Sequence, residues 1–299
     1  MARIANPKRG IDTIRATSDG QNVPNTPAPI DAPLLLGRYR PLRLLGRGGS
    51  SQVWQGIDET LGRDVAIKLF SASSHADDYR SELRLLASLS HHGIVSIVDA
   101  GLDESAADDP RPFLVMELLR GKTIREAMMA RVLSPREVGE IGFEIAEALD
   151  YVHSRGVIHR DVTPSNVILT EYGTASSRPR ARLTDFGIAI GIASQSTGGN
   201  LIKGTAGYVS PEQVRSEPLT PASDIYSLGL VMLECFTQER AYPGEPVAAA
   251  LARLQSQPTI PKSVPKQWRE LITQMVKSEP FDRPTAAEVA GQIRHILRK

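Results

Sequence analysis

The chain has 299 residues, of which 41% are hydrophobic and 23% are charged, an ordinary composition for a globular protein with one large or two smaller cores. Its formal net charge of +1 favours neither a nucleic-acid partner nor an anionic membrane surface. The single cysteine, Cys235, excludes a disulfide within the chain and is typical of a reducing compartment. No apolar run reaches the roughly 18–20 residues that cross a bilayer, and no signal peptide opens the chain, so we expect a cytoplasmic protein without a membrane span.

Residues 1–37 are predicted to form a disordered tail. Prolines recur there among asparagine, threonine and aspartate, and hydrophobic periodicity is absent. Such a segment does not bury enough apolar surface to offset the entropy of ordering it. A solvated tail is the simplest interpretation, and a docking segment is the alternative.

A glycine-rich turn is expected next, between strands at 39–45 and 52–57. The turn reads Gly46-Arg47-Gly48-Gly49-Ser50-Ser51. Glycines let backbone N–H groups approach phosphate oxygens without interference from a Cβ atom. The order strand–turn–strand argues against a dinucleotide-binding motif, which needs a helix after the turn. Alone the run is weak evidence, because many hairpins are rich in glycine.

The apolar run Val65–Phe70 is predicted to be a buried strand that carries one lysine, Lys68. A lysine in a buried strand is costly unless it is paired. It is therefore either a surface side chain or a group that binds phosphate. A helix is expected over 77–89, followed by paired strands at 94–100 and 112–118.

A long amphipathic helix is expected to follow. Ser134 and Glu137 form a capping box with Pro135 at the first helical position, and apolar residues recur at helical spacing as far as Val152. The helix delivers residues 159–166, His-Arg-Asp-Val-Thr-Pro-Ser-Asn, to one fixed place. Irregular chain on a rigid helix suits a catalytic loop.

Three oxygen-bearing side chains follow this helix. Asp161 and Asn166 are five positions apart, and Asp185 comes nineteen residues after Asn166, behind two short strand-like runs. Two acids and an amide brought together make a hard-oxygen site suited to Mg²⁺ or Mn²⁺. One acid is then left to accept a proton from a hydroxyl, which is the chemistry of phosphoryl transfer from a nucleotide.

The runs His-Arg-Asp-x-x-x-x-Asn at 159–166 and Asp-Phe-Gly at 185–187 match the signature motifs of protein kinases. Over residues 38–298 the chain resembles the Hanks-type serine/threonine protein kinases of bacteria. Further matches are Gly46, Gly48 and Val53 of the glycine-rich pattern, Val65-Ala66-Ile67-Lys68 after it, and Ser210-Pro211-Glu212, whose Glu212 would pair with Arg283.

The resemblance implies an α+β, bilobal kinase fold, with a small β-rich lobe at 38–117, a larger α-rich lobe at 118–299 and ATP between them. The implied reaction is transfer of the γ-phosphoryl group of ATP to serine or threonine hydroxyls of proteins. Protein substrates, no nucleic acid and a transient homodimer for autophosphorylation in trans are the implied partners. The implied phosphorylation sites are Ser194, Ser196 and Thr197, whose phosphate would pair with Arg160.

The resemblance also assigns roles to individual residues. Asp161 would orient the acceptor hydroxyl and take its proton, and Lys68, paired with Glu82, would hold the α- and β-phosphates. Asn166 and Asp185 would hold Mg²⁺. The implied nucleotide-binding residues, with Glu117 and Leu119 acting through their backbone, are Leu45, Gly46, Arg47, Gly48, Gly49, Ser50, Ser51, Val53, Ala66, Lys68, Met116, Glu117, Leu119 and Ile168.

Three positions depart from the family pattern, and at one of them Ser210 stands in place of an alanine. Ser51 replaces the third glycine, which is a mild change, but Thr163 replaces a lysine that normally touches the γ-phosphate and the attacking oxygen. Loss of one such contact can cost roughly 2–4 kcal/mol of transition-state stabilisation, or about 10²–10³ in rate. We expect activity at this site, because the other catalytic groups are all present.

Three alternatives stay open at this point. ATP binding without turnover would favour a pseudokinase. A small-molecule phosphotransferase shares the catalytic-loop pattern, but Ser210-Pro211-Glu212 with Arg283 argues against it. A regulatory binding module that acts through the tail is compatible with an active enzyme.

Overall fold

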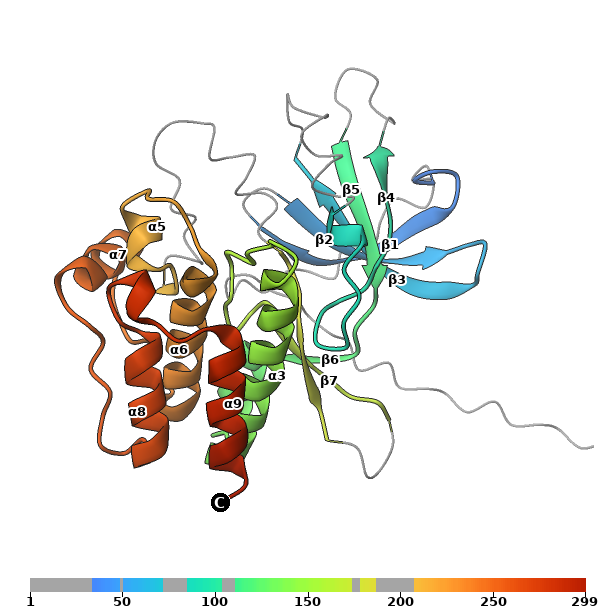
Figure 1. Cartoon of the computed structure of the whole chain (residues 1–299). Coiled ribbons are helices and arrows are strands. Elements are labelled where there is room, and N and C mark those ends of the chain that lie inside the picture. The colour runs from blue at the N-terminus through green and yellow to red at the C-terminus, as the bar shows by residue number, and fades with distance from the viewer. Residues whose placement is uncertain (1–33, 49–50, 72–84, 104–110, 174–177, 187–206) are drawn as a thin grey trace, which may run out of the picture.

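The computed structural model describes residues 34–48, 51–71, 85–103, 111–173, 178–186 and 207–299. A five-stranded sheet forms one lobe, and a larger lobe built mainly of helices lies beside it (Figure 1). This arrangement confirms the predicted α+β, bilobal fold.

The sheet of the smaller lobe is antiparallel throughout. Its register places Val53 opposite Lys68 and Ala66 opposite Met116. Because side chains alternate between the faces of a strand, these four residues lie on one face of the sheet. The strands, in the order in which they pair, are β1 (Tyr39–Arg47), β2 (Ser51–Asp58), β3 (Arg63–Phe70), β5 (Arg111–Glu117) and β4 (Ile97–Asp103).

The opposite face of this sheet carries a small apolar cluster, which includes Leu35. Leu35 is only 6% exposed and forms an isolated bridge with Tyr39. The predicted tail therefore extends too far, because residues 34–37 belong to the lobe that burial of Leu35 helps to stabilise. The cluster consists of Leu35, Tyr39, Val65, Ile67, Phe113 and Val115.

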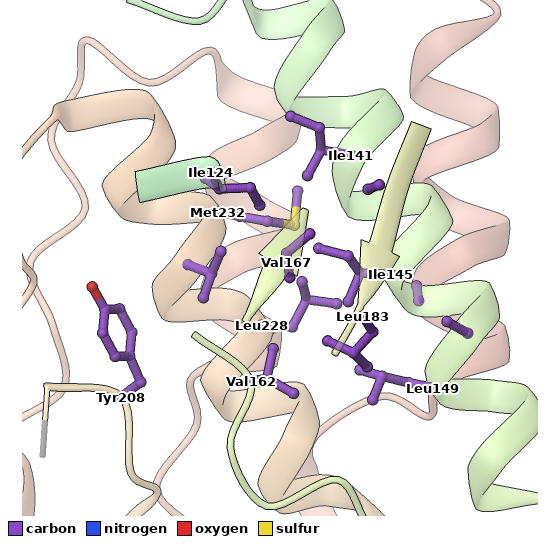
Figure 2. Packing of buried hydrophobic residues seen from close by; sticks show 14 of the residues in the cluster. Ile124, Ile141, Ile145, Leu149, Val162, Val167, Leu183, Tyr208, Leu228 and Met232 are labelled. Atoms are coloured by element: carbon purple, nitrogen blue, oxygen red, sulfur yellow. The ribbon is translucent and has the colours of Figure 1, made fainter. Parts of the chain in front are cut away.

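The helical lobe is organised around two helices, α3 (Pro135–His153) and α6 (Pro221–Thr237), which pack against each other. Figure 2 shows their apolar side chains meeting those of Val167 and Leu183. Around this pair lie α2 (Ile124–Ala130), α5 (Pro211–Val214), α7 (Pro246–Gln255), α8 (Lys266–Met275), η2 (Pro280–Asp282) and α9 (Ala286–Leu297).

A three-stranded antiparallel sheet packs against α2 and α3. It contains β6 (Gly121–Thr123), β7 (Val167–Thr170) and β8 (Arg180–Leu183). The strand predicted from residue 94 begins only at Ile97, because Val95 donates its N–H to the Leu183 carbonyl at 2.9 Å. The preceding segment is thus tied to β8 through Val95, while Ser96 accepts the N–H of Glu117, the last residue of β5, at 3.0 Å.

The local sequence signals of the helices are confirmed. Ser134 and Glu137 form the predicted capping box at the start of α3. Of the helix predicted over 77–89, residues 85–87 are helical, and 72–84 lie outside the described residues. None of the helices in the described ranges combines the length and hydrophobicity that a bilayer crossing requires.

Candidate active site

The backbone of the catalytic loop is held by one carboxylate. Asp224, buried in the first turn of α6, accepts the N–H groups of His159 and Arg160, each at 2.8 Å. The same carboxylate lies 2.7 Å from the Nε2 atom of His153 at the end of α3. Arg160 has φ +69°, a left-handed conformation that is strained for a side chain of this size. Asp224 therefore supports the loop and holds it in this unusual turn.

His159 joins the loop to the strand that leads to Asp185. The Nδ1 atom of its ring accepts the N–H of Asp161 at 3.3 Å, and Nε2 lies 2.9 Å from the Thr184 carbonyl. A carbonyl only accepts, so Nε2 carries the proton of a neutral ring. Complete burial lowers the pKa of His159 below its ordinary value, which agrees with this assignment. Its ring centroid lies 4.7 Å from that of Phe186, so the two rings pack against each other.

Asp161 and Asn166 are directly bonded. The Asn166 amide donates to the Oδ2 atom of Asp161 at 2.7 Å and to its backbone carbonyl at 2.9 Å. This leaves the Asn166 amide oxygen as the atom suited to a cation. Thr163, the unusual residue of the loop, is buried, and its carbonyl accepts the Asn166 N–H at 3.1 Å.

Backbone pairing places Asn166 beside Asp185. The N–H of Thr184 donates to the Asn166 carbonyl at 2.8 Å, and Val167 of β7 pairs with Leu183 of β8. Asn166 therefore precedes, and Asp185 follows, a pair of bonded strands. Asp185, with φ +57°, then turns out of the strand direction.

Lys68 connects the two lobes at this point. Its ammonium group lies 2.9 Å from Oδ1 of Asp185, with 10% of the lysine side chain and 29% of the aspartate side chain exposed. Glu82, the predicted partner of Lys68, lies outside the described residues. Next to the pair is a pocket lined by Lys68, Leu86, Val95, Ile97, Leu114, Met116, Asp185 and Phe186.

The donor set fits a magnesium ion held together with phosphates. One carboxylate and one amide oxygen are typical protein ligands of Mg²⁺, which keeps its remaining positions for water and phosphate oxygens. Within the described ranges there is no cluster of three or more His, Cys, Asp or Glu that could hold a metal without such help. The residues therefore suit a metal that arrives with a nucleotide.

The predicted nucleotide-binding residues are only partly placed. Gly49 and Ser50 lie outside the described residues, while Gly48 donates its N–H to the Ser51 carbonyl at 2.8 Å. The apolar members, which come from both lobes, are buried or partly buried. They are Leu45, Val53, Ala66, Met116, Leu119 and Ile168.

Sequence reasoning missed the partner of Glu117. Arg182 of β8 donates to the Glu117 carboxylate at 3.0 Å through Nη1, and the Ser96 N–H donates to it at 2.7 Å. Burial works against ionisation of Glu117, but these donors outweigh it and lower its pKa. The ion pair ties the segment between the lobes to the strand before Asp185. The alternation of arginines with apolar residues in β8 was the signal that could have pointed to Arg182.

A second ion pair was predicted correctly. Glu212 accepts from Nη1 and Nη2 of Arg283 at 2.7 and 2.9 Å, in a fully buried bidentate pair. Glu212 lies on α5 next to Gln213, which donates to the Arg160 carbonyl at 3.1 Å. The ion pair therefore anchors a helix that contacts the catalytic loop.

A sheet lobe and a helical lobe joined at a Lys–Asp pair, with an Asp–Asn loop beside it, define the protein kinase architecture. The model of the protein kinase domain matches residues 39–293, and the chain belongs to this family.

Among its relatives is the serine/threonine-protein kinase PknA of Mycobacterium tuberculosis, 35% identical over 247 residues, which cover 80% of this chain and 56% of the relative. PknL of the same species is 33% identical over 276 residues, covering 88% and 66%. The probable serine/threonine-protein kinase PknB of Bifidobacterium longum is 33% identical over 276 residues, covering 86% and 39%. The chain thus spans about half the length of such relatives.

Proposed function

We propose that this chain is an ATP- and Mg²⁺-dependent protein kinase that phosphorylates serine and threonine hydroxyls. The observation that carries the proposal is that hydrogen bonds hold the side chains of Asp161, Asn166 and Asp185 together. His159 and Asn166 both bond to Thr184, the residue before Asp185, and Asn166 also bonds to Asp161. A proton acceptor and two oxygen ligands are thereby held in one unit. The printed names of the relatives support serine and threonine as acceptors.

Each group would have a distinct part in the reaction. Asp161 would orient the acceptor hydroxyl and take its proton. Asn166 and Asp185 would hold Mg²⁺, which when bound neutralises charge on the phosphates. Lys68 would contact the α- and β-phosphates, and the chain would supply mainly positioning and electrostatic stabilisation.

The predicted Glu82 contact would orient Lys68 in the nucleotide complex. The apolar residues Leu45, Val53, Ala66, Met116 and Ile168 would enclose the adenine, and the backbone of Glu117 and Leu119 would bind its edge. The bond from Arg182 to the Glu117 carboxylate supports this part of the proposal, because it fixes the segment whose backbone groups would bind the adenine.

We also propose autophosphorylation, in a transient homodimer, at Ser194, Ser196 or Thr197, which lie outside the described residues. Arg160 supports this proposal. Its Nε atom is buried and, within the described part of the chain, has no hydrogen-bond partner. A phosphate would supply the acceptor that a guanidinium requires.

The test is phosphate incorporation by the purified chain with ATP and Mg²⁺, with sites mapped by mass spectrometry and Asp161→Asn as the control. Phosphate on a serine or threonine that is absent from the control is the expected result, and it would show that Thr163 is compatible with catalysis. No incorporation by the wild type, with nucleotide binding retained, would contradict the proposal and favour a pseudokinase. Thr163→Lys would then test whether the missing charge is the cause.

A further inference from the structure

Arg253, on α7, is a buried cation that is bound by backbone carbonyls. It is 2% exposed, and within the described ranges no Asp or Glu forms an ion pair with it. Burial lowers its pKa, and its Nε atom has no hydrogen-bond partner in the same ranges. An apolar side chain of similar volume is often as stable or more stable at such a position. Stability alone therefore does not explain an arginine here.

The guanidinium group binds the backbone of a segment far away in the sequence. Nη1 donates to the Val209 carbonyl at 2.6 Å, and Nη2 donates to the Gly207 carbonyl at 3.2 Å. The group also lies over the ring of Tyr242, 5.0 Å from its centroid. A planar group with several fixed donors can bind two carbonyls at once, which a lysine cannot do in the same geometry.

Residues 207–210, called the 207–210 strip below, are also held from α6. The carbonyl of Tyr208 accepts the Ser227 hydroxyl at 2.8 Å, so three successive carbonyls are bound by side chains. The Tyr208 hydroxyl accepts from Arg125 and donates to Glu234. The backbone of the strip is thus fixed, while Gly207 and Val209 stay partly exposed.

The other end of the strip reaches the catalytic loop. Gln213 accepts the N–H of Ser210 at 2.8 Å and donates to the carbonyl of Arg160, next to Asp161. Figure 1 shows α5, which carries Gln213, beside α7. The strip therefore forms a partly exposed and rigid border of the site where an acceptor hydroxyl must be presented.

We propose that Arg253 is a positioning residue for the protein acceptor: it fixes the 207–210 strip, against which the acceptor polypeptide lies while its hydroxyl is at Asp161. The inference rests on the proposed function. It predicts a defect confined to the acceptor, because the groups that Arg253 contacts in the described part of the chain are the 207–210 strip and Tyr242, which are not assigned to the nucleotide.

The test compares Arg253→Met, Arg253→Lys and Arg294→Met with the wild-type chain. Arg294 is a matched control, since it also lies over an aromatic ring, that of Phe143, but sits on α9 away from the strip. Steady-state kinetics with casein as the acceptor would give separate KM values for casein and ATP. We expect the casein KM of Arg253→Met to rise about tenfold, as expected for the loss of charge-assisted hydrogen bonds, with the KM for ATP unchanged.

Arg253→Lys should fall between wild type and Arg253→Met, and Arg294→Met should match the wild type. If Arg253→Met does not fold, Arg253→Lys decides by the same criterion. An unchanged casein KM, or an equal rise in both KM values, would overturn the inference while leaving the proposed function intact. No transfer by the wild type would overturn the proposed function first, so the two failures are distinguishable.

Discussion

Two ion pairs of this chain are similar in length but differ in their surroundings. The Glu212–Arg283 pair is buried, and Glu212 accepts a further bond from Ser223 at 2.7 Å. Lys68 and Asp185 lie 2.9 Å apart, yet within the described ranges Lys68 has no second hydrogen-bond partner for its remaining donors. Arg283 also donates hydrogen bonds to the carbonyls of Ala222, Lys277 and Ser278.

This difference separates an ion pair that stabilises the fold from one in which the lysine can exchange its carboxylate partner for a phosphate. In the first pair, nearly every donor and acceptor is used, so either partner alone would be left as an uncompensated buried charge. The second pair is partly exposed and joins the two lobes, so Lys68 can turn to a phosphate oxygen without leaving an unpaired group in the core. The predictions below test that contrast.

Arg283→Ala should produce the largest loss of stability. It leaves the Glu212 carboxylate buried without its cation, and removal of one partner of a buried pair costs about 3–5 kcal/mol. Urea denaturation monitored by circular dichroism would measure the change in the free energy of unfolding. A loss below about 1 kcal/mol would show that the pair is not structural.

Lys68→Met should have the opposite profile. We expect kcat to fall by about 10²–10³, as when one charge contact to the reacting group is lost, with a smaller effect on the free energy of unfolding than that of Arg283→Ala. Kinase assays and urea denaturation of the same preparation would separate the two effects. Retention of full activity would contradict the role assigned to Lys68.

Arg182→Met should give an intermediate effect on the nucleotide site. The variant leaves Glu117 without its guanidinium donors, and the loss of charge-assisted hydrogen bonds costs about 1.5–3 kcal/mol. Weaker ATP binding in isothermal titration is the expected result. Arg136→Met is the control, because its exposed pair with Glu140 on α3 is worth well under 1 kcal/mol.

His159→Gln should have the smallest effect, visible as a change in pH dependence. Burial in the folded state lowers the pKa of His159. Below the ordinary value of about 6.5, the unfolded chain therefore binds more protons than the folded chain, and the free energy of unfolding decreases as the pH is lowered. The variant should lose part of that slope, at most about 1.4 kcal/mol per pH unit. Urea denaturation at pH 7 and pH 5.5 would measure it.

The exposed His295 on α9 provides the control for this experiment, since His295→Gln should keep the wild-type slope. His91, whose pKa is also lowered by burial, is present in all three proteins, so the difference reports on His159 alone. Equal slopes in all three would contradict a neutral, buried His159 as the source.

The sequence predicted the features that depend on local chemistry. The cap at Ser134, the buried strand of Lys68 and the loop at 159–166 all follow from neighbouring residues. The pairing of Glu212 with Arg283 came from the family resemblance, not from spacing. Local signals and the family resemblance were therefore enough to predict the fold and the positions of the candidate site residues along the sequence.

The remainder depends on contacts that no local pattern encodes. Arg182 meets Glu117 from 65 residues away, and Arg253 meets Val209 from 44 residues away. The partner of a buried arginine is chosen by how the strands and helices pack, so composition and periodicity do not identify it. The burial of Leu35 was missed for the same reason, since only the folded sheet offers its apolar face.

The support of the catalytic loop by Asp224 has a consequence for hydrogen exchange. The amide hydrogens of His159 and Arg160 are bound to a carboxylate on α6, a helix at the centre of the core, and Val162 points into that core (Figure 2). These amides can exchange with solvent only when the loop separates from α6. The most irregular segment of the site should therefore exchange as slowly as the central helices, so that its protection reports the opening of the whole lobe.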